Sequence, residues 1–119
     1  MSERLDEHEA NQYYNLLIET LEQLGKPANM QIQKLKGTDV TDELALDFCN
    51  IGMPAAKKLH EISWITQEQL RSLSLLYTTL NDMSKNATLW TENALHNSAE
   101  WAECREKARD ILKQITEAF

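Results

Sequence analysis

Apolar residues recur at helical spacing in the first part of the chain. Between mostly polar neighbours, one stripe is formed by Tyr13, Leu17, Leu21 and Leu24. A spacing of three or four residues places side chains on a single face of an α-helix. Gly25 and Pro27 follow, and glycine favours the left-handed cap whereas proline cannot continue a helix. The pattern therefore predicts an amphipathic helix that ends near residue 25.

The pattern is least regular over residues 25–40, which we expect to form an irregular connection. Within this segment, residues 29–36 are compatible with a short helix closed by Gly37. The alternation of Met30 and Ile32 is equally compatible with a short extended piece. Both alternatives stay open on the sequence alone.

Two further apolar stripes predict a pair of short helices in the middle of the chain. The first begins near Asp39 or Thr41, because both residue types are good helix caps, and it is ended by Gly52. Pro54 suits the first turn of the second helix, where its missing N–H group is harmless. We therefore expect a helical corner at residues 51–53.

A corner between two short helices is also the geometry of a helix-turn-helix, so residues 42–62 are a candidate DNA-binding segment. Lys58, however, occupies a position where an inward apolar residue is usually needed. The acidic residues Asp42, Glu43 and Asp47 would also lie close to the phosphates of DNA, which repel carboxylates. A plain helical corner is therefore favoured over a DNA-binding motif.

The last 54 residues carry the most regular pattern in the chain. Thr66 and Gln69 form a capping box, and Ile65 and Leu70 form the accompanying hydrophobic staple. These signals predict a helix start at residue 66. Read in sevens, a single apolar phase then continues to the C-terminus through Leu73, Leu76, Leu80, Met83, Ala87, Trp90, Ala94, Asn97, Trp101, Cys104, Ala108, Ile111, Ile115 and Ala118.

A single helix over residues 66–119 would be about 80 Å long, whereas a compact domain of this length is only about 35 Å across. We therefore predict a break near residues 84–88, because poor helix formers crowd this part of the sequence. Residues 96–98 are a second weak point, since Ser98 can cap a new helix. Alternatively, an unbroken seam over residues 73–118 would join two chains in a homodimer.

These elements predict an all-α fold, an antiparallel bundle of four to six helices in one domain that covers residues 1–119. The chain has only 3 glycines and 2 prolines, too few for a β protein rich in turns. Its length is sufficient for a single core without disulfides or metals. The polar segment 1–8 is expected to fray at the end of this domain.

Charge and composition narrow the function. The chain carries 12 basic and 19 acidic residues, a formal net charge of −7, which argues against binding to nucleic acid. Two cysteines, Cys49 and Cys104, do not make a disulfide framework and are expected to be small buried apolar residues. The sequence shows neither a secretory signal nor a stretch long and apolar enough to span a membrane, so we expect a cytoplasmic protein.

Candidate catalytic chemistry is sparse. Glu92, His96 and Glu100 would line one face of an unbroken helix as a candidate metal strip, although the heptad frame turns this face to solvent. No nucleophile elbow, Cys-x-x-Cys pair or glycine-rich phosphate loop occurs. We therefore expect no catalytic residues and no cofactor.

The remaining signal is an uneven charge distribution. Residues 39–47 contain Asp39, Asp42, Glu43 and Asp47 without a basic residue, which suggests a surface that binds a basic partner protein. Trp64, between two predicted helices, would act as an apolar anchor for such a partner. The sequence thus favours a non-catalytic adaptor, inhibitor or immunity-type regulator over a bundle that binds a small ligand or metal, and over a DNA-binding regulator.

Overall fold

The computed structural model describes residues 6–117, and every regular element in this range is helical. The helices are α1 (Glu7–Gly25), α2 (Ala28–Lys34), α3 (Val40–Asp47), α4 (Met53–Glu61), α5 (Gln67–Met83), α6 (Glu92–Asn97) and α7 (Ala99–Glu117). A π-helical turn, η1 (Phe48–Gly52), joins α3 to α4, and a 3-10 turn, η2 (Ala87–Leu89), precedes α6. The predicted all-α fold is confirmed for the described residues.

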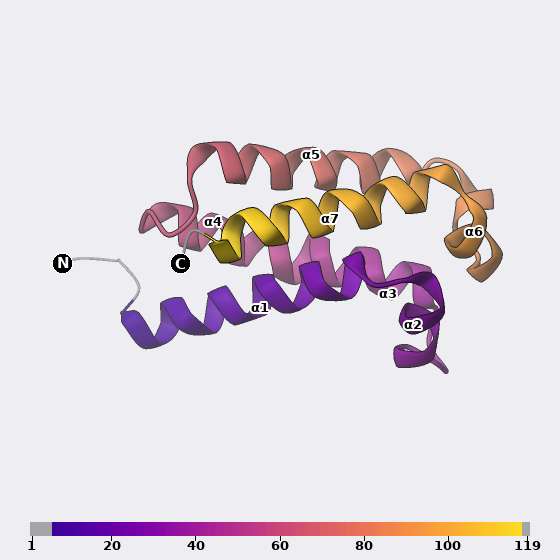
Figure 1. The fold of residues 1–119 in the computed structure, drawn as a ribbon, viewed down its shortest axis with the longest axis horizontal. Helices are drawn as coiled ribbons and strands as arrows, with labels where there is room; N and C mark the ends of the chain where they lie inside the picture. Colours follow the sequence, from indigo (N-terminus) through magenta and orange to yellow (C-terminus); the bar gives the residue numbers. More distant parts are fainter. Residues whose placement is uncertain (1–5, 118–119) are drawn as a thin grey trace.

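Four long helical rods form an up-and-down bundle (Figure 1). They are α1, the bent rod α3–η1–α4, α5 and α7, and consecutive rods run in opposite directions (Figure 1). α1 packs against α7 and the bent rod, while α5 packs against α4 and α7. The short helices α2 and α6 contact each other at the end of the bundle where α1 ends. The four rods and the two short helices α2 and α6 make six helical segments within residues 6–117. This agrees with the predicted antiparallel bundle of four to six helices.

The core is built from the predicted apolar stripes. Leu17, Leu21 and Leu24 of α1 are fully buried, whereas Tyr13 is only half-buried. On α5 and α7 the heptad positions point into the same core, and the buried ones are Leu73, Leu76, Leu80, Met83, Trp101, Cys104, Ala108, Ile111 and Ile115. These seam residues pack within one chain, so a homodimer through them would require the bundle to open, whereas Ala87 and Asn97 of the predicted seam are exposed. Ala118 lies outside the described residues.

The long C-terminal pattern breaks where the sequence indicates. α5 ends at Met83, and the chain turns through residues 84–86 before η2. A second break lies at Ser98, whose extended ψ of 145° ends α6. The Ser98 hydroxyl then accepts a hydrogen bond from the Trp101 backbone N–H at 3.2 Å and so caps α7. Both weak points predicted from the sequence are therefore breaks.

The predicted corner at residues 51–53 is wrong, because the chain stays helical from Val40 to Glu61. Gly52 has helical torsions of φ −63° and ψ −50°, and the Met53 N–H bonds to the carbonyl of Phe48 in a π turn. Such single-turn expansions are frequent inside α-helices, and here one directly precedes Pro54, which has no N–H to donate. Without a turn, residues 42–62 form neither a plain helical corner nor a helix-turn-helix.

The connection over residues 25–40 is more regular than predicted, because α2 forms within it. Of the two alternatives for this segment, the short helix is the one found, and Gly37 follows it with a positive φ of 91°.

At the N-terminus, the Asp6 carboxylate accepts a hydrogen bond from the Glu9 N–H at 2.8 Å. This cap starts α1 at Glu7, so within the frayed segment predicted at 1–8 the last two residues are helical, and residues 1–5 lie outside the described range. No helix of residues 6–117 combines the length and the apolar character needed to cross a bilayer.

Candidate functional site

A groove opens at one corner of the bundle, between the bent rod and the second half of α5. α5 packs against α4, but its last turns stand apart from α3. The hollow has a volume of about 580 Å³, within the range of roughly 300–1,000 Å³ typical of ligand pockets. We call it the α3–α5 groove, and its lining residues are Asp42, Ala45, Leu46, Cys49, Tyr77, Leu80, Asn81, Ser84, Ala87 and Trp90.

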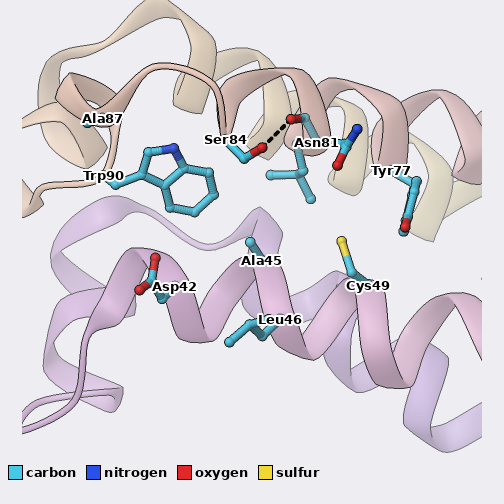
Figure 2. A pocket seen from close by; sticks show the side chains of 10 residues that line it. Asp42, Ala45, Leu46, Cys49, Tyr77, Asn81, Ser84, Ala87 and Trp90 are labelled. Carbon is cyan, nitrogen blue, oxygen red and sulfur yellow. Dashed lines mark hydrogen bonds between the residues drawn. The ribbon is translucent and has the colours of Figure 1, made fainter.

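Each wall of the groove is one face of a helix. The lower wall in Figure 2 carries residues 42, 45, 46 and 49 of α3 and η1, and the upper wall carries residues 77, 80, 81 and 84 of α5 and its cap. Both sets follow the spacing i, i+3, i+4, i+7, which places side chains on one helical face. The two helices therefore present their side chains to each other across an open space.

The floor and rims of the groove are largely apolar. Ala45 and Leu80 are buried and form the floor, whereas Leu46 and Tyr77 remain 49% and 41% exposed. Large apolar side chains that gather at a hollow, unlike scattered single ones, are typical of interaction sites. The α3–α5 groove thus offers apolar surface that another molecule can bury.

Trp90 closes one end of the groove as a fixed wall. Its indole Nε1 donates a hydrogen bond to the carbonyl of Met83 at 2.8 Å. Its ring packs edge-on against Trp101, with ring centroids 5.3 Å apart and planes at 80°. Trp101 is itself buried and donates its Nε1 hydrogen to the carbonyl of Leu89 at 2.6 Å. These contacts fix the position of the Trp90 ring.

Negative charge lies at the same end. Figure 2 shows Asp42 below Trp90, with Cys49 and Tyr77 at the opposite end. Slight desolvation, a side-chain hydrogen bond with Asp39 and the charges of Asp39 and Glu43 raise the pKa of the exposed Asp42 carboxyl. No lysine or arginine occurs between residues 37 and 56 or between residues 72 and 84. The walls of the groove therefore carry negative charge without a basic residue of their own.

The predicted acidic surface is divided by the fold. Asp42 lines the α3–α5 groove, and Asp39 acts on its carboxyl, as described above. Asp47 is half-buried on another side of the rod, where it lines a hollow of about 190 Å³ with Glu19 and Ile51. Burial, and then the charge of Glu19, raises the pKa of Asp47. Asp42 and Asp47 therefore line different hollows.

Trp64 does not lie beside the acidic residues. It belongs to the connection between α4 and α5, at the end of the bundle opposite α2 and α6 (Figure 1). The ring is half-buried and packs edge-on against Tyr14, with centroids 6.3 Å apart. Trp64 and the acids on α3 therefore lie far apart, because the length of the bent rod separates them.

The predicted metal strip is also wrong. Glu92 and His96 belong to α6 and Glu100 belongs to α7, and the break at Ser98 ends the common helical face that the prediction required. Among residues 6–117, no three histidine, cysteine, aspartate or glutamate side chains come together in a way that could hold a metal ion.

The two cysteines occupy different environments. Cys104 is buried in the core, where burial raises its pKa to about 11 and its sulfur lies 3.5 Å from that of Met83. Cys49 is half-buried at the groove, and burial raises its pKa as well. A raised pKa keeps a thiol protonated near neutral pH, and the thiolate is the reactive form. Both cysteines therefore lack the activation expected of a nucleophile.

Most groove residues were not identified from the sequence. Leu46 and Tyr77 are apolar, but they fall outside the core-facing stripes of their helices. Trp90 was assigned to the internal seam, and it is in fact half-buried at the end of the groove. The sequence does show apolar residues outside the core-facing stripes of two helices, which is a sign of an apolar surface. It does not show that these two helices are neighbours.

No protein-family model, curated protein or solved structure matches this chain. The α3–α5 groove is therefore the feature from which a function is inferred.

Proposed function

We propose that the protein is a non-catalytic binding module that receives an apolar, basic segment of another protein in the α3–α5 groove. The observation that carries this proposal is the joint placement of exposed Leu46 and Tyr77, the Trp90 wall and Asp42 at one hollow. Such a module would work as an adaptor, an inhibitor or an immunity-type regulator. We place it in the cytoplasm, because its two cysteines are free.

The binding energy would come mainly from the apolar rims. Removing apolar surface from water contributes about 25 cal/mol per Å², and aromatic residues in a well-packed centre dominate many interfaces. Trp90 supports this role because its ring is already fixed by a hydrogen bond and by Trp101. A preformed wall lowers the side-chain entropy that this protein loses when a partner binds.

Asp42 would select the charge of the partner. A lysine or arginine beside it gains from uncompensated negative charge, whereas an acidic side chain is repelled. The formal net charge of −7 would in addition speed the approach of a basic protein. Chemical recognition at the groove and long-range attraction therefore favour the same class of partner.

The test compares two leucines of similar exposure. Leu46 lines the groove, whereas Leu75 is 59% exposed on α5 and lies outside it. The wild type and both variants are first used to capture proteins from the source cells. Proteins that the wild type and Leu75→Lys retain, but Leu46→Lys does not, are then purified. Calorimetry measures the Kd of each purified protein for the wild type and for both variants. We expect Leu46→Lys to raise the Kd about tenfold or more and Leu75→Lys to leave it unchanged. Equal Kd values for both variants would contradict the proposal.

A small apolar ligand is the second candidate, because the volume of about 580 Å³ would also hold a molecule of that class. Native mass spectrometry of the purified protein discriminates between the two. A reproducible added mass that is lost in Leu46→Lys would favour the ligand, and a bare chain would favour the partner protein.

A further inference from the structure

The groove also indicates the shape of its occupant. Resting on the proposed function, we infer that the occupant of the α3–α5 groove is an amphipathic α-helix of a partner protein, about two turns of which lie in the groove with a lysine or arginine beside Asp42. The inference rests on the spacing of the walls, the hydrogen-bonding state of their backbones and the position of the charge.

The walls have the size and relief of a helix-packing site. Each wall runs over seven residue steps, 42 to 49 and 77 to 84, which corresponds to about 10 Å of helix or two turns. Residues at i, i+3, i+4 and i+7 form ridges, and the side chains of another helix pack into the grooves between them. A helix in the groove would fill the corner at which α3 and α5 diverge, in the same way that the four rods pack elsewhere in the bundle.

An extended peptide is a poor fit to these walls. Extended segments usually bind by adding to a sheet edge, where unpaired backbone groups accept and donate hydrogen bonds. Both walls here are helical, so their backbone groups are already paired within the helices. An extended backbone in this apolar groove would be left with buried, unpaired groups, which are costly. A helix brings its own backbone hydrogen bonds and avoids this cost.

The distribution of charge fixes where the basic residue lies. Asp42 stands at the Trp90 end, while the lining at the opposite end, with Cys49 and Tyr77, is uncharged (Figure 2). A cation beside Asp42 would also lie near the indole ring of Trp90, which attracts cations. The expected occupant therefore has apolar residues at i, i+3 or i+4, and i+7, and a basic residue at one end of this stripe.

A peptide selection tests the inference without knowledge of the natural partner. Phage displaying random linear 16-residue peptides are selected on the full wild-type chain and depleted on Leu46→Lys. We expect enriched peptides to carry the helical stripe with a terminal lysine or arginine, and to lose at least tenfold in affinity when a proline is placed mid-stripe. Selection on Asp42→Lys should replace the basic residue by glutamate or aspartate. Selection on Asp47→Lys, outside the groove, should keep the basic residue.

Three results would overturn the inference: enriched peptides without helical spacing, indifference to the central proline, or a basic preference that persists on Asp42→Lys. The absence of any enrichment over Leu46→Lys would overturn it as well. These failures are separable from failure of the proposed function. If the peptide selection fails in one of these ways but a natural partner still loses affinity for Leu46→Lys, the groove remains the binding site and only the helical occupant is excluded. Circular dichroism of each variant verifies its fold, which is expected to persist because Asp42 and Leu46 are exposed.

Discussion

At the scale of single residues, the contact between Gly52 and Thr20 decides the course of the bent rod. A Cβ atom on Gly52 would lie 2.5 Å from the Thr20 hydroxyl oxygen and 3.2 Å from a ring carbon of Phe48. Thr20 is buried and donates its hydroxyl hydrogen to the carbonyl of Leu17 at 2.9 Å, so it has little freedom to move. Glycine at this position lets α1 approach the π turn closely.

We therefore predict that Gly52→Ala lowers the free energy of unfolding by about 1–3 kcal/mol, because the added methyl group overpacks the contact. Urea denaturation measures the change. In a Thr20→Ala background the same substitution should cost much less. Gly37→Ala is the control, since its φ of 91° strains any side chain but no atom lies within 4 Å. Its cost, about 1–2 kcal/mol, should be the same in both backgrounds. An equal cost of Gly52→Ala with and without Thr20 would contradict this account.

A second prediction concerns Asp47. Burial and the charge of Glu19 raise its pKa, so the folded state holds the proton more tightly than the unfolded chain does. Protonation of Asp47 therefore contributes to the free energy of unfolding. This contribution is complete below the ordinary carboxyl pKa of about 3.9, and it is lost as the pH rises through the raised pKa of the folded state. Asp47→Asn should therefore stabilise the protein at pH 7 and have no such effect near pH 3.

Thermal unfolding at both pH values measures the effect of Asp47→Asn. The matched control is Asp110→Asn, an exposed position on α7. A stabilisation by Asp47→Asn that is equally large at pH 3 and pH 7 would show that charge is not its cause.

At the scale of elements, the start of α5 is set by its capping box. The Gln69 N–H donates to the Thr66 hydroxyl at 3.0 Å, and the Thr66 N–H donates to the Gln69 side chain at 2.9 Å. We predict that Thr66→Ala lowers the free energy of unfolding by about 1 kcal/mol. Thr78→Ala, in the exposed middle of the same helix, should change it by less than about 0.5 kcal/mol. Equal effects of the two substitutions in denaturation experiments would contradict the capping role.

Elements with local causes could be predicted from the sequence. The capping box at Thr66 and the break after Met83 both depend on residues within a few positions of each other. The bent rod could not be predicted, because Gly52 and Pro54 are ordinary signals for ending one helix and starting another. The close approach of Gly52 to Thr20, some thirty residues earlier in the chain, is a long-range contact that these local signals do not contain.

At the scale of the whole molecule, burial of the heptad seam decides the oligomeric state. Leu73, Leu76, Trp101 and Ile115 are fully buried within a single chain, so dimerisation through them would require the bundle to open. We predict that the isolated protein is a monomer of 13.7 kDa. Native mass spectrometry at micromolar concentration measures this directly, and a stable dimer would contradict the internal seam.

The candidate site could be predicted only in part, because it depends on how distant elements are placed. Of the predicted partner-binding residues, Asp42 lines the α3–α5 groove, whereas Asp47 faces α1 and Trp64 lies at the other end of the bundle. Likewise, the strip that includes His96 depends on a helix that breaks at Ser98. The groove itself arises where α3 and α5 diverge, and the apolar pattern of either helix contains no information about that separation.

The most direct test of the groove as a binding site is an NMR titration that follows the three tryptophan indole N–H signals. The ligand is the partner segment or a selected peptide. Trp90 closes the groove, whereas Trp64 lies at the far end of the bundle and serves as an internal reference. We predict a saturable shift of the Trp90 signal, an unchanged Trp64 signal, and loss of the effect in Leu46→Lys. Binding that shifts Trp64 and leaves Trp90 unchanged would contradict this prediction.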